Sequence, residues 1–123
     1  MRDGFIDSRA TPAAVAPYSI VAFNGTRGQV RQAAADTDPL AGIADSMGSV
    51  AGGMADVQLT QIADARAGGT LAPGDRVTAD ANGRAVKAVK RAGFAVFYIG
   101  FAQEPAVADD VFPVLIAPGV IDG

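Results

Sequence analysis

The sequence predicts an all-β protein: a small β-sandwich or β-barrel of the jelly-roll type, with an extended N-terminal arm. Three observations predict this class. Short runs of alternating or β-branched apolar residues recur along the 123-residue chain, and such runs are typical of strands. Gly, Pro, Asn and Asp separate them roughly every eight to twelve residues, the spacing of small sandwiches and barrels. The segment with helical propensity, 86–93, is too short for a stable helix.

Residues 1–16 mix charged residues, Ala and Pro without a regular period, which predicts an extended arm rather than a packed element. The remaining residues, 17–123, have the length of one ordinary domain, and we expect a single β domain that stays folded without the arm. Within the arm, two large apolar side chains lie between arginines. Such a group suits an anchor that buries apolar area on a neighbouring molecule while the arginines meet acidic groups. The candidate contact residues are Arg2, Phe5, Ile6 and Arg9.

The first half of the β domain divides into segments with strand character. Residues 18–23 are a β-type run closed by Asn-Gly-Thr, and residues 28–34 are its expected hairpin partner. Residues 41–46 form a short third strand after a turn. In residues 54–66, apolar and polar residues alternate until about Gln61, where the break predicts a β-bulge.

The second half begins with a hairpin, GDRVTADANGRAV, at residues 74–86. Its Asn-Gly corner is the preferred pair of a type I′ turn, because both central residues need a positive φ. Residues 94–103 and 109–121 follow as the most hydrophobic strands. The residues expected to shape turns are Gly74, Asp75, Asp80, Asn82 and Gly83.

A second hypothesis for this corner is a metal or phosphate site. Asp80 and Asn82 match the first positions of a calcium-binding loop, but the twelfth position, which must be acidic in such loops, is Arg91. We therefore expect a structural turn without a metal. The Gly-rich segment GSVAGGM lacks the Lys-Ser/Thr pair of a phosphate-binding loop, so we expect a flexible connection and no cofactor.

Two predicted strands, 94–101 and 111–116, present apolar side chains on both faces. Either another layer of the same domain covers the second face, or that face is buried between subunits, because a chain this short has little material for a third layer. We expect a homo-oligomer of two or three copies. The residues expected in or beside its interface are Phe97, Ile99, Phe101 and Phe112.

The composition argues against several functional classes. The chain has no cysteine and no histidine, which removes disulfides, thiolate nucleophiles, the usual general base and the commonest metal ligand. Its formal net charge is −3 and its ten Lys and Arg residues are scattered, so we expect no nucleic-acid binding. The N-terminus carries Asp3 and Asp7 instead of a continuous apolar segment, and no run reaches the roughly 18 apolar residues of a membrane span. We expect neither a signal peptide nor membrane association.

The two alternatives to a structural role are a carboxylate-based enzyme and a ligand-binding β-barrel. A carboxylate-based enzyme using Asp109 and Asp110 is disfavoured, because adjacent residues of a strand point to opposite faces. We therefore expect no catalytic residues and no enzymatic activity. A small-ligand or carbohydrate-binding β-barrel is the alternative function, although aromatic residues make up only 7% of the chain, which is poor material for a sugar-binding platform.

Three stretches of the sequence carry a resemblance in their order along the chain. They are ADTDPLAGIAD, GGMADVQLTQIADARAGGTLAPGDRVTADANGRAVKA and YIGFAQEPAVADDVFPVLIAPGVI. Together they resemble the small capsid cement, or decoration, proteins of tailed bacteriophages, over about residues 17–121.

The resemblance implies a non-enzymatic, mostly β protein that binds the outside of an assembled icosahedral shell and bridges neighbouring major capsid subunits. Its partners would be the major capsid protein and further copies of itself. Its place would be the outer surface of the virion, after synthesis in the bacterial cytoplasm. Carried over by position, Gly74, Asp75 and residues 80–83 would be turn residues, and the arm at residues 1–16 would contact the capsid.

Overall fold

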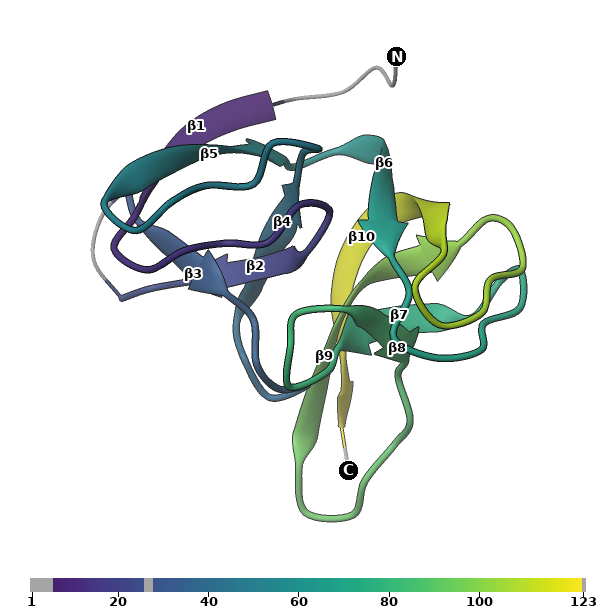
Figure 1. Cartoon of the computed structure of the whole chain (residues 1–123). Helices are drawn as coiled ribbons and strands as arrows, with labels where there is room; N and C mark the ends of the chain where they lie inside the picture. The colour runs from purple at the N-terminus through teal and green to yellow at the C-terminus, as the bar shows by residue number, and fades with distance from the viewer. Residues whose placement is uncertain (1–5, 26–27, 123) are drawn as a thin grey trace.

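The computed structural model describes residues 6–25 and 28–122, and over these residues the chain forms ten β-strands and no helix (Figure 1). The predicted all-β class is confirmed. Accordingly, no described helix has the length and apolar character needed to cross a membrane. The strands are β1 (Ile6–Thr11), β2 (Ile20–Phe23), β3 (Val30–Gln32), β4 (Leu40–Ala44), β5 (Gly53–Gln58), β6 (Gln61–Arg66), β7 (Arg76–Ala79), β8 (Ala85–Lys87), β9 (Ala95–Ala102) and β10 (Val111–Asp122).

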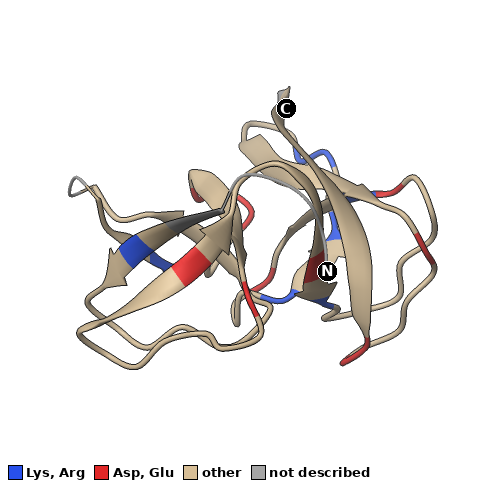
Figure 2. Ribbon diagram, turned by 90° about the horizontal axis from the view of Figure 1, so that it is seen from above, with Lys and Arg blue, Asp and Glu red and all other residues tan. Residues whose placement is uncertain are grey.

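The strands form two five-stranded antiparallel sheets, in the orders β1-β5-β4-β2-β3 and β6-β10-β9-β7-β8. Each sheet curls until its outer strands approach each other. An isolated bridge joins Ala10 to Gln29 in the first sheet, and another joins Ala67 to Ala85 in the second. Figure 2 shows the two curled sheets side by side, with acidic and basic residues on both. Each half of the chain therefore forms its own curled, barrel-like sheet.

One apolar cluster joins the two sheets. It contains Ile20 and Ile43 of the first sheet and Ile99, Phe112 and Val114 of the second, each at most 3% exposed. Most of its other members are alanines. Small side chains let backbones approach closely, so this core is thin and tolerates little added volume.

A smaller cluster fills the other side of the first sheet. Successive residues of a strand face opposite sides, so Val21 lies in this cluster while its neighbours Ile20 and Ala22 lie in the main core. Val15, from the segment before β2, closes the small cluster and is 3% exposed. The first sheet is therefore covered on both sides.

The part of the N-terminal segment that the structure describes, residues 6–16, is packed on the first sheet instead of forming a separate arm, which corrects that expectation for these residues. Residues 6–11 form β1, which pairs with β5 along its whole length. Thr11 and Val15 are buried. A strand held by backbone hydrogen bonds needs no apolar period, so the polar sequence IDSRAT gave no sign of pairing.

Residues 54–66 form two strands rather than one bulged strand. β5 ends at Gln58 in the first sheet and β6 begins at Gln61 in the second. Gln61 has a φ of 62°, in the left-handed region, which redirects the chain. The Gln58 side-chain amide donates to the carbonyl oxygens of Thr60 (3.1 Å) and Ile62 (2.6 Å). The alternation of apolar and polar residues is lost at the predicted position, near Gln61. The cause is the passage of the chain from the first sheet to the second, not a β-bulge.

The turn between β3 and β4 contains a part-buried ion pair that should make stability depend on pH. Arg31 donates to Asp38 at 3.0 Å, and the same carboxylate accepts from the backbone N–H groups of Ala34 (2.8 Å) and Ala35 (3.1 Å). The hydrogen bond from Arg31 lowers the pKa of Asp38 most, burial opposes this, and the two backbone donors lower it further.

Because the folded-state pKa of Asp38 is depressed, its stabilisation is present above the unfolded-state pKa of about 3.9 and is lost as the pH falls through the folded-state value. Asp38→Asn should therefore destabilise the fold by about 1 kcal/mol at pH 7, and the difference from wild type should shrink as the pH falls through the folded-state pKa of Asp38. Urea denaturation at several pH values measures this. An equal deficit at pH 7 and pH 2 would contradict a role for the charge.

Candidate interaction surfaces

The outer face of the second sheet carries a row of exposed and half-buried side chains. Leu115 of β10 lies opposite Ile62 of β6 on one side and Phe101 of β9 on the other, and Phe101 lies opposite Arg76 of β7. Directly paired residues place their side chains on the same face. Leu115 is 39% exposed, so this row offers apolar surface to a partner.

An aromatic pair extends this row. The rings of Tyr98 and Phe101 meet edge to face, with centroids 5.8 Å apart, and the Arg76 guanidinium lies 5.5 Å from the Tyr98 ring centroid. A cation over a ring and an edge-to-face pair both hold side chains in place. We call the five residues Ile62, Arg76, Tyr98, Phe101 and Leu115 the sheet face.

The predicted interface residues do not share one face. Phe101 belongs to the sheet face. Ile99 is fully buried and Phe112 is 3% exposed, both in the main core, so neither has surface to offer a partner, and their assignment to an interface is corrected. Phe97 is partly buried and packs against the same core.

A β-bulge of β10 lies beside Ile99, one of the wrongly assigned residues. The register of β9 against β10 shifts between Ile116, opposite Gly100, and Gly119, opposite Tyr98. Two residues of β10, Ala117 and Pro118, therefore lie opposite one residue of β9, and the extra residue interrupts the alternation of β10. Apolar residues on both faces of β9 are explained by the main core on one side and the sheet face on the other.

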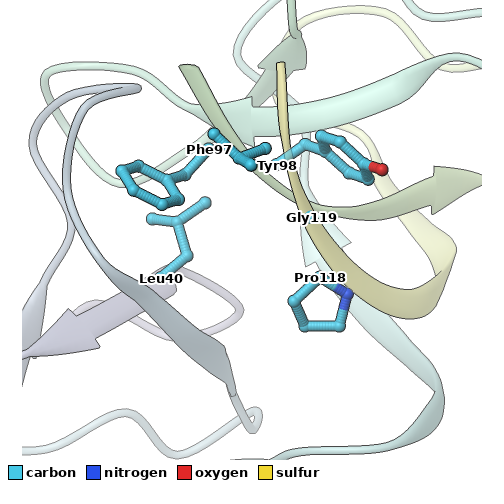
Figure 3. A pocket seen from close by; sticks show the side chains of 6 residues that line it. Leu40, Phe97, Tyr98, Pro118 and Gly119 are labelled. Atoms are coloured by element: carbon cyan, nitrogen blue, oxygen red, sulfur yellow. The ribbon is translucent and has the colours of Figure 1, made fainter. Parts of the chain in front are cut away.

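A shallow apolar groove opens between the sheets beside this bulge (Figure 3). The Phe97 ring lies against Leu40 of the first sheet, whereas Tyr98 points away from Leu40 on the other side of β9. The groove has apolar walls and no charged side chain among the described residues that line it, so it suits an apolar side chain better than a sugar. Its lining residues are Leu40, Phe97, Tyr98, Pro118, Gly119 and Val120.

The hairpin corner is built by its acidic residue. Asp80 Oδ1 accepts from the backbone N–H groups of Asn82 (2.8 Å) and Arg84 (2.9 Å), and the Gly83 N–H donates to the Asp80 carbonyl (3.2 Å). Gly83 has a φ of 72°, whereas Asn82 is not among the described residues with positive φ. The loop is therefore a three-residue turn with a left-handed Gly, not the predicted type I′ turn.

The turn at Gly74 and Asp75 is stabilised in the same way, by an aspartate side chain and a glycine with positive φ. Asp75 Oδ2 accepts from the Ala72 N–H at 2.9 Å, and the Asp75 N–H donates to the Ala72 carbonyl at 3.1 Å. Gly74 has a φ of 88°, and its N–H donates to the Ala102 carbonyl at 2.7 Å. Asp75 and Gly74 thus shape the turn that leads into β7.

The hairpin corner also connects the two sheets. The Gln32 side-chain amide of β3 donates to the Asn82 carbonyl, and the Ile20 N–H of β2 donates to the Gly83 carbonyl, each at 2.8 Å. A Cβ on Gly83 would lie 2.6 Å from Gln32 Cγ. The corner therefore has a packing role as well as a conformational one.

Gly83→Val should lower stability by about 2 kcal/mol, because it forces a β-branched residue to a positive φ and crowds Gln32. Gly25→Val is the matched control, since Gly25 has a φ of 80° and open space around its Cβ position. Its loss of stability measures the cost of the positive φ alone.

Asp80→Ala should lower stability by about 1 kcal/mol, and EDTA should not change the melting temperature. A marked loss of stability in EDTA would favour a metal site instead.

The acidic side chains are largely engaged in turns and ion pairs. Asp110 Oδ2 accepts from the Val107 N–H at 3.1 Å, and Asp109 Oδ1 pairs with Arg84 at 3.1 Å. Within the described part of the chain, no group of three or more His, Cys, Asp or Glu side chains is placed to hold a metal ion.

The predicted anchor is only partly visible. Ile6 begins β1, and Arg9 lies within β1 and is half-buried. Arg2 and Phe5 lie outside the described residues. Sequence reasoning missed Arg76 and Leu115 as surface partners of Phe101, because only strand pairing brings these residues together.

A five-stranded, curled sheet packed beside a second one defines this chain as a small all-β module. It matches no model of a protein family and no curated protein. Its fold is similar to the solved structure of the head fiber gp8.5 N base of bacteriophage phi29, with a TM-score of 0.67 and 19% sequence identity. The match covers 92% of this chain and 93% of that one, so the two proteins share the arrangement of both sheets.

Proposed function

We propose that this protein is a non-enzymatic structural component of a phage particle that binds the outer surface of the assembled head and bridges neighbouring major capsid subunits. The observation that carries this proposal is the fold shared with a phage head fiber base over almost the full length of both chains. The sequence resemblance to phage decoration proteins points to the same location independently.

A stabiliser of this kind acts through many modest contacts repeated around a shell. Repetition raises the effective concentration of each further contact, so no single contact needs to be strong. The protein would reside on the outside of the virion, with the major capsid protein and further copies of itself as partners. The N-terminal end would contact the capsid through Arg2, Phe5, Ile6 and Arg9.

Electron cryo-microscopy of heads tests the proposal. Purified protein is added to empty heads of the phage whose genome encodes the chain, and to its unassembled capsid subunits as a control. We expect density on the outer surface between neighbouring capsid subunits, and no binding to free subunits. Protein that stays in the supernatant, or density inside the head, would refute the proposal.

A second copy of the chain is the proposed partner of the sheet face. Arg76 lies at the β7 side of this face, next to Phe101. In a two-fold dimer the same patch of both copies meets, so the apolar side chains of this face would pack on one another. Burying Leu115 and Phe101 against a second copy would add apolar area to the contact.

Leu115→Asp should therefore weaken self-association at least 10-fold, about 1.4 kcal/mol, because it buries an unpaired charge. Sedimentation velocity over a range of concentrations measures this. Val107→Asp is the control, since Val107 is 56% exposed, lies in the connection between β9 and β10 and is not part of the sheet face. A wild-type protein that is monomeric both in solution and on heads, or an equal effect of the two variants, would contradict this interface.

A further inference from the structure

The longest stretch of the second half without an acidic residue includes a loop at one end of the molecule. Residues 81–103 contain four basic residues and no Asp or Glu, a formal charge of +4 in a chain whose total is −3, which leaves −7 for the rest. Residues 88–94, the connection from β8 to β9, lie in the middle of this stretch. We call them the tip loop. Figure 1 shows that the tip loop extends past both sheets, beside the C-terminal end of β10.

The tip loop is held firmly at its base. Ala88 is 8% exposed and its N–H donates to the Arg76 carbonyl at 2.8 Å. Arg91 pairs with Asp36 of the first sheet's β3–β4 turn at 2.6 Å, and its guanidinium lies 4.6 Å from the Phe94 ring centroid. These contacts fix the loop to both sheets, so little conformational entropy remains to be lost on binding.

The exposed side chains of the tip loop combine charge and apolar surface. Val89 is 60% exposed and Phe94 is 53% exposed. Lys90, between Val89 and Arg91, is exposed and forms no ion pair with any residue that the structure describes. By contrast, Lys87 at the end of β8 lies 4.0 Å from Asp75. The loop therefore presents one unpaired cation between two exposed apolar groups.

We propose that the tip loop is a docking element for an acidic patch with apolar side chains on the outer surface of the head shell. This inference rests on the proposed function and names the chemistry of one contact. Lys90 meets a carboxylate of the shell, and Val89 and Phe94 pack on apolar atoms beside it. A protein surface fits better than a nucleic acid, because apolar side chains form much of the tip and the basic cluster is small.

Binding of Lys90→Glu to empty heads tests this inference, with Lys87→Glu as the control of equal net charge. At low salt we expect Lys90→Glu to weaken binding at least 10-fold and Lys87→Glu less than 3-fold, as measured by co-sedimentation. The Lys90 variant should also lose part of the salt dependence shown by the wild type. Circular dichroism verifies that both variants are folded.

A second matched pair tests the apolar part of the contact. Val89→Ser should weaken head binding several-fold, whereas Val107→Ser, at a similarly exposed valine of another turn, should leave it unchanged. Equal binding by Lys90→Glu and Lys87→Glu would overturn the inference while leaving the proposed function intact. Failure of the wild type to bind heads would instead refute the proposed function. Binding of the wild type to duplex DNA, lost in Lys90→Glu, would show that the tip recognises a polyanion and would also overturn the inference.

Discussion

Gly100→Ala is expected to destabilise the protein by about 3 kcal/mol and to lower its melting temperature by about 10 °C or more. A Cβ at Gly100 would run into the carbonyl oxygen of Leu115 and would lie 2.8 Å from the Leu115 carbonyl carbon and 3.1 Å from the Ala117 nitrogen. These are backbone atoms of the paired strand β10, so they cannot rotate away as a side chain would. The strands must separate beside the bulge, where Ile99 enters the main core. Thermal denaturation followed by circular dichroism measures the loss.

Gly69→Ala is the matched control for this substitution. The nearest atom to a Cβ at Gly69 is Val86 Cγ1, at 3.9 Å, an ordinary contact. We expect a change within about 1 kcal/mol. Similar melting temperatures for the two variants would mean that β9 and β10 are not held as closely as the structure indicates.

The central strands could be predicted from sequence because local signals specify them. β2 and β9 lie within the predicted ranges 18–23 and 94–103, and β10 ends one residue beyond the predicted range 109–121. Each range is an apolar run bounded by turn residues. β-branched and aromatic residues between Gly, Pro, Asn and Asp carry this information within a few positions of the chain. The hairpin at residues 74–86 was found in the same way.

The elements that could not be predicted depend on distant partners. β1 is polar, and its backbone pairing with β5 joins residues far apart in sequence. The crossing at Gln61 shows in the sequence as a lost alternation, but a bulge and a change of sheet both produce that signal. Only the pairing of β6 with β10 distinguishes them.

The same limit applies to the candidate surfaces. Alternation placed Ile99 and Phe101 on one face, whereas the structure buries Ile99 in the core and leaves Phe101 half-buried on the sheet face. The acid-free stretch 81–103 is visible in the sequence. The position of its tip loop, 88–94, at one end of the molecule follows from the direction of β8 and β9, and is not a local property.

Deleting residues 2–16 is expected to unfold at least the first sheet. The deletion removes β1, and with it six residues paired with β5, together with the buried side chains of Thr11 and Val15. Burial of a valine contributes about 1.5–3 kcal/mol, and each of several backbone hydrogen bonds adds about 0.5–1.5 kcal/mol. The sum approaches the whole stability of an ordinary domain, about 5–15 kcal/mol. The small core around Val21 and Val57 would also be opened to water.

Deleting residues 2–5 alone separates this structural role from a role in docking. This shorter deletion leaves β1 in place, so the melting temperature should stay within about 2 °C of wild type. If Phe5 and Arg2 contact the capsid, occupancy on heads should nevertheless fall several-fold, because apolar burial and ion pairs are lost at a repeated contact. Denaturation and co-sedimentation of both deletions decide between the possibilities. A deletion of residues 2–16 that melts like the wild type would show that β1 adds nothing to the sheet, and would restore the N-terminal segment as an independent arm.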